Sequence, residues 1–412
     1  MIRKLFLAFV FFAPFTSFFA ISAWLRVPVV INQLLFLTVL VAIFKRNKVK
    51  IKWIFKEDLY ILAFFGLVWL SFLLGFKEKR SFNHSLAYTN SIMFFFFLSK
   101  YVIEILKIKA FEISKVIYYS FLSSSYIIVL DFLGKNLFNL ELRNMYTTVD
   151  WAVSNMDYFI RNKLFRVGGV AEEPGSMALF YNIYFGISLY YLNQKINNKT
   201  KIVGMFFLFS FCHFALFSNA GIALAIVSLI LIFLTNKFQT QTISKAQLIW
   251  IMISFLALFS AIFIIYIFNF EEIQNSIEKF INKLMFDENR KYSSSGQRLK
   301  QWSRAIQNFF SRPIFGYGPG FGVNQDAEGY LSVYLTILAD LGIMAFLFFF
   351  SFIERIFFKL NTLPIKTRSF LLFSLITSTI HLFIVADFYH APFWILLVLI
   401  QTIYKENKTI KL

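Results

Sequence analysis

The sequence predicts an all-α polytopic integral membrane protein with about twelve transmembrane helices. Hydrophobic residues make up 58% of the chain, 58 residues are phenylalanine, and the mean hydropathy is +0.65. These values lie far above those of soluble domains. The apolar residues gather in runs of the length that a bilayer demands, and the charged residues gather between the runs. We therefore interpret residues 1–412 as a single polytopic membrane domain.

The candidate spans follow one another along the whole chain. They cover roughly residues 5–25, 28–44, 58–76, 86–103, 116–134, 175–193, 202–217, 219–235, 248–268, 328–350, 369–386 and 390–405. The first follows Arg3 and Lys4 and so resembles a signal peptide, but no small-x-small cleavage site follows it, and we expect a retained helix. The single cysteine, Cys212, lies inside an apolar run, which excludes disulfides and cysteine metal sites.

The connections between the spans predict the orientation of the chain. Alternate connections carry clusters of lysine and arginine, and such clusters concentrate on the cytoplasmic side of a membrane. This pattern places both termini in the cytoplasm, together with Lys48, Lys199 and Lys366. The two long loops, residues 135–173 and 269–326, then lie on the outer face. We interpret the net charge of +19 as this topology signal, which excludes a nucleic-acid partner.

The first long outer loop ends in the motif R-V-G-G-V-A-E-E-P-G-S, which runs from Arg166 to Ser176. Pro174 fits the first turn of the next span, so Glu172 and Glu173 lie at a helix N-terminus, where the dipole favours negative charge. Two interpretations are open. The carboxylates cap the helix beside a flanking salt bridge, or Arg166 and Glu173 face a shared cavity. In that cavity the arginine would hold a phosphate, and the glutamate would act as a base or orient an acceptor.

The second long outer loop contains the largest polar stretch of the chain. From Ser295 the sequence predicts an amphipathic helix with Lys300, Arg304 and Gln307 pointing to water. Its apolar face consists of Leu299, Trp302, Ala305, Ile306, Phe309 and Phe310. Arg298 lies at the edge of this face, and we expect its side chain to extend along the membrane surface and not into solvent. The helix should stop at Arg312, because the residue before a proline leaves helical geometry.

A glycine-rich turn follows this helix. Its glycines occur at alternate positions, 316, 318, 320 and 322, and residues without a Cβ let the backbone turn tightly and approach a ligand closely. A basic amphipathic helix followed by such a turn suits an anionic substrate at a membrane face. The substrate-binding candidates of this loop are therefore Arg290, Trp302, Gly316, Gly318 and Gly320.

Asp340 lies about eleven residues into its predicted span, or roughly 16 Å deep at helical rise. An acid at that depth is costly unless it is paired, so it is either functional or a structural partner of Arg298, Arg290 or a tyrosine hydroxyl. In the last outer turn, Asp387 and His390 are expected to be interfacial anchors. No metal-ligand spacing or cofactor motif connects the remaining histidines, and the sequence predicts neither a metal nor a cofactor. These histidines are His84, His213 and His381.

The order of these motifs resembles the O-antigen polymerase and O-antigen ligase superfamily of bacterial surface-polysaccharide enzymes. The motifs are R-x-G-G-x-x-E-E-P-G, a polar hairpin ending in Gly221, G-Q-R-x-x-x-W-x-x-A, P-x-x-G-x-G-x-G and a span with L-A-D-L-G. The resemblance implies an inner-membrane enzyme with its active site facing the periplasm. It moves a glycan from an undecaprenyl-diphosphate carrier to an acceptor sugar without a metal. Arg166 and Arg298 match the outer-loop arginines thought to engage the diphosphate, and Glu173, Glu172 or Asp340 would supply a base.

The chain departs from the family pattern in two places, and the second departure favours a polymerase over a ligase. The hairpin of the family often reads S-x-S-R-G, whereas Ser218 to Gly221 lack the arginine. Ligases usually carry a histidine after the glycine-rich turn, and residues 324–331 contain none. The alternative from another class is a flippase for lipid-linked oligosaccharides, which should show repeated halves and broken helices at the midplane. Lipid-linked oligosaccharide, the bilayer and a chain-length regulator are the expected partners.

Overall fold

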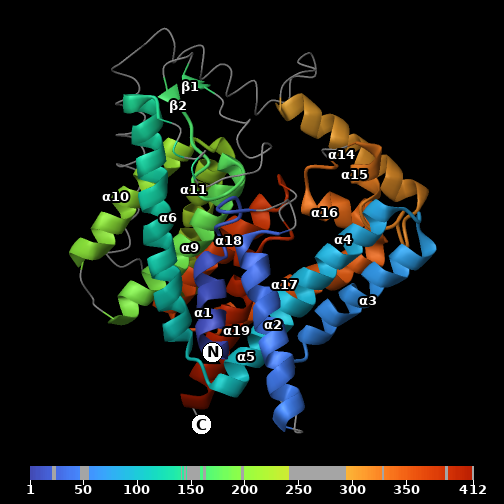
Figure 1. The fold of residues 1–412 in the computed structure, drawn as a ribbon, viewed down its shortest axis with the longest axis horizontal. Coiled ribbons are helices and arrows are strands. Elements are labelled where there is room, and N and C mark those ends of the chain that lie inside the picture. The colour runs from blue at the N-terminus through green and yellow to red at the C-terminus, as the bar shows by residue number, and fades with distance from the viewer. Residues whose placement is uncertain are drawn as a thin grey trace.

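Helices dominate the computed structural model of the chain (Figure 1). The structure describes residues 1–20, 25–46, 55–140, 142, 145, 158–160, 164–195, 199–240, 294–326, 329–385 and 388–410. The α-helices are α1 (Ile2–Phe12), α2 (Val27–Arg46), α3 (Asp58–Leu74), α4 (Lys79–Thr89), α5 (Ser99–Leu106), α6 (Ala110–Phe138), α9 (Pro174–Lys195), α10 (Lys199–Leu216), α11 (Asn219–Thr240), α14 (Ser294–Ser311), α15 (Phe321–Gln325), α16 (Val333–Thr336), α17 (Gly342–Asn361), α18 (Ile365–His381) and α19 (Ala391–Ile410). Two π-helical segments, η1 (Asn90–Leu98) and η2 (Ile337–Leu341), connect α4 to α5 and α16 to α17. Strands β1 (Tyr158–Ile160) and β2 (Leu164–Phe165) form a short antiparallel pair.

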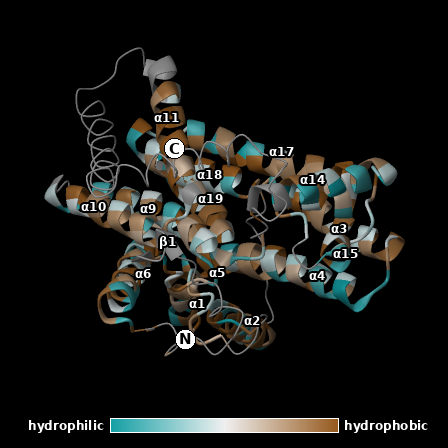
Figure 2. Ribbon diagram, turned by 90° about the horizontal axis from the view of Figure 1, so that it is seen from above, coloured by the Kyte–Doolittle hydropathy of each residue, from teal (hydrophilic) through white to brown (hydrophobic). Residues whose placement is uncertain are grey.

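Four helical segments of the described chain are long and apolar enough to cross a membrane. They are Val27–Lys45, Lys79–Leu106, Ala110–Phe138 and Val333–Asn361, and shorter apolar helices cover Asp58–Leu74, Thr200–Leu216 and Ala220–Thr235. Hydrophobic residues run along the greater part of the described helices (Figure 2). The predicted helical membrane class is thus confirmed, whereas the count of about twelve spans is not confirmed by these helices. The predicted span at 248–268 lies outside the described residues.

The first helix is shorter than the sequence predicts. α1 ends at Phe12, whereas the predicted span continued to about residue 25. Pro14 follows directly, and a proline lacks the N–H that a continuing helix needs. The chain instead turns, with Phe15 N donating to Phe12 O at 2.9 Å and Thr16 N donating to Pro14 O at 3.0 Å. This turn places residues 13–20 at the same end of the molecule as the loop before α9.

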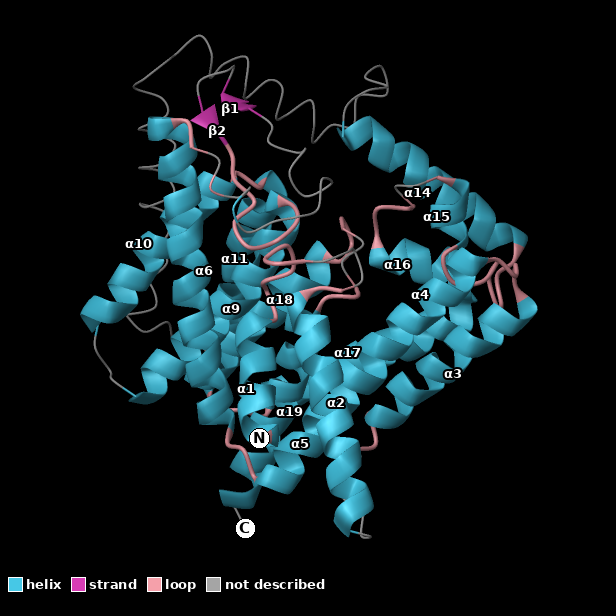
Figure 3. Cartoon of the chain, viewed as in Figure 1, coloured by secondary structure: helices cyan, strands magenta, loops and turns pink. Residues whose placement is uncertain are grey.

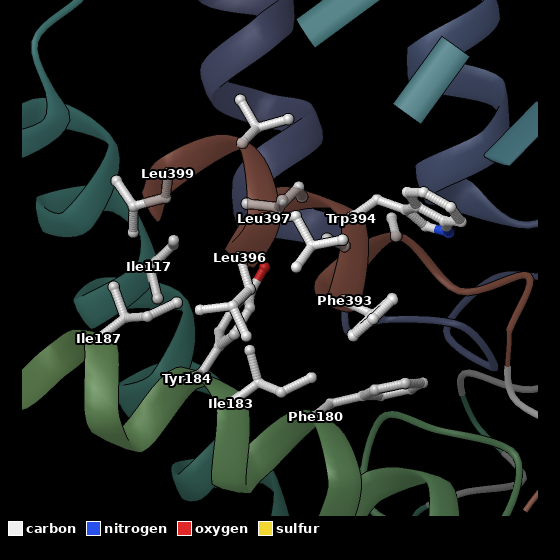
Figure 4. Close-up of a cluster of buried hydrophobic side chains, with 14 of the residues drawn as sticks. Ile117, Phe180, Ile183, Tyr184, Ile187, Phe393, Trp394, Leu396, Leu397 and Leu399 are labelled. Atoms are coloured by element: carbon white, nitrogen blue, oxygen red, sulfur yellow. The ribbon is translucent and has the colours of Figure 1, made fainter. Parts of the chain in front are cut away.

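The core is built around α9 and α19. Isoleucine and aromatic side chains of α9 meet the first turns of α19, and Ile117 of α6 closes the cluster (Figure 4). Trp394 is fully buried and donates its Nε1 proton to Phe388 O at 3.0 Å. Tyr184 is also buried and donates its hydroxyl proton to Val10 O at 2.9 Å. The start of α1 and the end of α19 lie at one end of the bundle, and β1, β2 and α14 lie toward the other (Figure 3).

The helix predicted at 328–350 is broken in the structure. α16 ends at Thr336, η2 ends at Leu341, and α17 begins at Gly342, which has a φ of 83°. The chain after α14 fits against this junction, with Ile343 N donating to Pro313 O at 2.8 Å. The depth of Asp340 in the membrane stays a prediction. Asp340 lies at the junction with the glycine-rich turn.

Candidate functional site

The loop that precedes α9 is fastened to the surrounding helices. Val167 N donates to Ala215 O of α10 at 3.2 Å, and Ser17 N donates to Val170 O at 3.0 Å. Gly169 has a φ of 58°, which favours glycine and lets the loop turn against α6. α9 begins at Pro174, as the sequence predicts. The acidic pair therefore stands on a fixed segment.

Glu172 and Glu173 are neighbours in the chain but have different surroundings. Glu172 is 6% exposed, forms an ion pair with Arg26, and accepts a hydrogen bond from Thr16 Oγ1 at 2.7 Å. Glu173 is exposed. A buried carboxylate held by a guanidinium and a hydroxyl has little capacity left to take a proton from a substrate. Of the two, Glu173 is the carboxylate that a substrate can reach.

Arg298 of α14 lies within the electrostatic reach of Glu173. Burial lowers the pKa of the half-buried Arg298 guanidinium, and the negative charge of Glu173 opposes that shift. The two residues come from different loops, and the charge of the acid acts on the cation across them. Arg166 is also half-buried and begins the loop that ends in Glu173. This group of Arg166, Glu173 and Arg298 is the candidate site.

The orientation of α14 differs from the prediction. Arg304 was expected to point to water, but it donates to Gly329 O at 2.9 Å and to Gly322 O at 3.3 Å. It also lies 3.5 Å from the Asp326 carboxylate. The expectation was wrong because a helical wheel does not show the loop carbonyls that require donors, and a guanidinium can satisfy several of them. On the opposite side, Phe310 is 74% exposed.

The glycine-rich turn is closed by Asp340. Its carboxylate is 1% exposed and accepts hydrogen bonds from Gly320 N at 2.9 Å and Gly322 N at 3.1 Å. Its backbone carbonyl accepts from Gly318 N at 2.8 Å. A Cβ at Gly316 would collide with the backbone of Asp340. At the other three glycines the nearest atoms belong to side chains, namely those of Phe76 at Gly318, His84 at Gly320 and Tyr330 at Gly322. These glycines thus permit close packing within the protein, and their assignment to a substrate stays a prediction.

His84 is a polar residue of this region that the sequence did not single out. Its Nδ1 lies 2.8 Å from the hydroxyl oxygen of Tyr389, and its ring occupies the space beside Gly320. Tyr88 lies one helical turn further along and is 2% exposed. His84 and Tyr88 are four residues apart, which places them on one face of a helix, and this spacing could have identified them. The spacing was missed because the predicted span began only at about residue 86.

The remaining candidates have separate positions. The indole ring of Trp302 lies 5.1 Å from the ring of Phe383, measured between centroids, so it packs on the loop after α18. Arg290 and Asp387 lie outside the described residues. His390 contacts Arg26, with 3.3 Å between Nδ1 and the guanidinium nitrogen. Within the described ranges, no group of three or more His, Cys, Asp or Glu residues is arranged to hold a metal ion.

Comparison with known families gives one match. Residues 204–350 match the family model described as O-antigen ligase. The matched segment runs from α10 to α17 and includes Arg298, the glycine-rich turn and Asp340, whereas Arg166 and Glu173 precede it. No curated protein matches the chain. With its apolar helices, the chain is a multi-pass membrane protein, and its residues 204–350 are similar to the O-antigen ligase family.

Proposed function

We propose that this protein is a polysaccharide polymerase that joins undecaprenyl-diphosphate-linked repeat units at the outer face of a bacterial inner membrane. The family indicates a glycosyltransferase-like enzyme of the ligase or polymerase type acting on lipid-linked glycans. The observation that carries the proposal is that the negative charge of the exposed Glu173 acts on the half-buried guanidinium of Arg298. An acid and a cation from two different loops therefore influence each other's charge.

In this proposal Arg298 and Arg166 bind the diphosphate of the donor. The acceptor hydroxyl attacks the anomeric carbon and gives its proton to Glu173. The bond between the anomeric carbon and the diphosphate oxygen breaks, and the undecaprenyl diphosphate leaves with the electron pair. Guanidinium groups suit this step because they stay charged and form paired hydrogen bonds with phosphate oxygens. The leaving group is already a weak base and needs charge stabilisation more than an acid.

The other two carboxylates have different roles in the proposal. Glu172 is bound to Arg26 and Thr16 and supports the loop. Asp340 accepts hydrogen bonds from two backbone amides and shapes the glycine-rich turn. Both are therefore positioning residues, and Glu173 is the proposed base.

The ligase alternative has one observation in its favour. Residues 324–331 lack the histidine that ligases usually carry after the glycine-rich turn, but His84 of α4 lies against Gly320 of that turn. His84 therefore supplies, from another helix, a histidine close to the backbone of the glycine-rich turn. The proposal remains a polymerase because Tyr389 already binds Nδ1 of this ring.

A deletion strain of the source bacterium tests the assignment. Loss of a polymerase should leave surface lipid with a single repeat unit, because ligation persists. Loss of a ligase should leave none, with long chains stranded on the carrier. We expect the single-unit phenotype, and stranded chains would overturn the polymerase proposal. A flippase would instead strand single units on the cytoplasmic side.

Glu173→Gln, reintroduced into that strain, tests the base. We expect most glycan elongation to be lost while the protein still inserts in normal amount. A residue that only caps α9 would cost about 1 kcal/mol of stability and leave elongation intact. Near-normal glycan length would remove Glu173 from the proposed mechanism.

A further inference from the structure

The segment between α1 and α2 is attached to the loop before α9. Thr16 Oγ1 donates to Glu172 Oε2 at 2.7 Å, and Ser17 Oγ donates to Ala171 O at 3.1 Å. A backbone bond from Ser17 N to Val170 O, at 3.0 Å, lies beside them. These contacts join parts of the chain that are more than 150 positions apart, with the two side-chain bonds separated by 156 and 154 residues. The N-terminal segment therefore builds part of the candidate site's support.

Arg26 adds the charged contact of this support. Its guanidinium forms an ion pair with Glu172 and lies 3.3 Å from His390 Nδ1. A guanidinium can only donate, so Nδ1 of His390 must accept, and the ring proton resides on Nε2. Arg26 thus connects three segments, which precede α2, α9 and α19. Its side chain is 19% exposed, so water competes weakly for these bonds.

We propose that Arg26 is a positioning residue that holds Glu173 toward Arg298 by fixing Glu172. Glu173 stands between the bound Glu172 and Pro174, whose ring fixes φ at the start of α9. The bound Glu172 and the fixed φ of Pro174 restrict the backbone on both sides of Glu173. The catalytic meaning of this arrangement rests on the proposed function, whereas the positioning itself can be measured without any glycan substrate.

The proposal predicts an effect that charge alone cannot produce. Removing the positive charge of Arg26 and removing the negative charge of Glu172 change the local potential in opposite directions. If Arg26 and Glu172 act by holding the backbone in place, loss of either charge should let the residue at position 173 turn away from Arg298. Both variants should then lower the positive potential that position 173 experiences.

A thiol at position 173 reports this potential. In the purified full-length Glu173→Cys protein, we would compare the rates of modification by an anionic and a cationic methanethiosulfonate reagent. The protein without this substitution gives the background from Cys212, which is buried. Arg298 should favour the anionic reagent by on the order of tenfold. Arg298→Ala in the same background should remove this preference and so calibrate the reporter.

We expect Arg26→Ala and Glu172→Gln each to remove most of the preference for the anionic reagent. The charge exchange Arg26→Glu with Glu172→Arg should restore part of it. Arg3→Ala is the matched control, because Arg3 forms an ion pair with Glu112 between α1 and α6 and is 53% exposed. It removes the same charge from the same end of the chain and should leave the preference unchanged.

If Arg26→Ala lowers the preference for the anionic reagent and Glu172→Gln raises it, the two residues act only through their charges, and the proposal is wrong. An unchanged preference in a folded Arg26→Ala protein would do the same. If Arg26→Ala fails to fold, Arg26→Lys retains the charge but loses the planar fork that reaches both partners, and an intermediate preference is expected. The reagent preference and glycan elongation are measured independently. If Arg26→Ala keeps the normal preference but Glu173→Gln loses elongation, the positioning proposal fails and the proposed function stands.

Discussion

Arg304 donates a hydrogen bond to the carbonyl oxygen of Gly329 at 2.9 Å, and this bond fixes the rotation of α14 about its own axis. The guanidinium also lies 5.3 Å from the centroid of the Tyr330 ring, so the middle of the helix is attached to the loop before α16. The same rotation turns Ile306 and Phe310 outward, with 46% and 74% of each side chain exposed. An exposed apolar edge beside a membrane span suits a helix that lies at the membrane interface.

Arg304→Ala should destabilise the protein. Hydrogen bonds to charged groups contribute about 1.5–3 kcal/mol each, and the substitution removes two of them. Gly322 O keeps a bond from Asp326 N at 3.2 Å, so the larger loss is at Gly329 O. Thermal unfolding in detergent measures the effect. Lys300→Ala is the control, because Lys300 is exposed on the same helix and should shift the midpoint little. Equal midpoints for the two variants would contradict the helix orientation described above.

The sequence predicted the extent of α14 but not its rotation. The helix predicted to begin at Ser295 and stop at Arg312 agrees with the observed Ser294–Ser311 to within one residue at each end, because Pro313 limits it locally. Its rotation depends on carbonyls of Gly322 and Gly329, whose positions follow from the tertiary fold. The hydrophobic pattern therefore identified an amphipathic helix and assigned Arg304 to the wrong surroundings.

The candidate site was predictable only in part, for a related reason. Glu173 and Arg298 stood out because each lies in a polar motif of an outer loop. Arg26 could not be identified, since its partner Glu172 lies far along the chain and nothing local indicates the pair. Asp340 was identified, but its bonds to the glycine-rich turn could not be, because Gly320 and Gly322 reach its carboxylate only through the tertiary fold.

Gly320→Ala should destabilise the glycine-rich turn. Gly320 has a φ of 79°, and an added Cβ would lie 2.8 Å from Cγ of His84. Backbone strain of this kind costs on the order of 1–3 kcal/mol before any steric clash is added. Gly204→Ala is the control, because nothing lies within 4 Å of that position in α10, and alanine should stabilise the helix slightly. Thermal unfolding of both variants measures the difference. A neutral Gly320→Ala would show that the turn is not packed against α4.

Asp340→Asn should lower stability and activity together. The amide retains one acceptor oxygen but turns an NH₂ group toward a backbone N–H, so one of the two bonds from Gly320 and Gly322 is lost. We expect a loss of about 1.5–3 kcal/mol, the contribution of a hydrogen bond to a charged group. Activity should fall only in proportion to the folded fraction. A variant of normal stability but without activity would instead return Asp340 to the list of bases.

Arg298→Ala should abolish glycan elongation in the complemented deletion strain. Alanine cannot stabilise the charge on the leaving diphosphate, and it removes the cation on which the charge of Glu173 acts. Arg298→Lys should recover only weakly, because an ammonium keeps the charge but lacks the paired N–H groups that match a phosphate. The surface-glycan length distribution measures both variants, with protein amount in the membrane fraction as the check on folding.

Lys300→Ala is the matched control for Arg298, replacing a cation two residues away on the exposed side of α14. If the outer loop acted only through its net charge, Lys300→Ala and Arg298→Ala would damage elongation equally. If the guanidinium beside Glu173 binds the donor, Lys300→Ala should leave chain length unchanged, while Arg298→Ala leaves single repeat units. Equal damage would therefore remove Arg298 from the site and leave α14 as a positively charged surface helix without a specific role in the transfer.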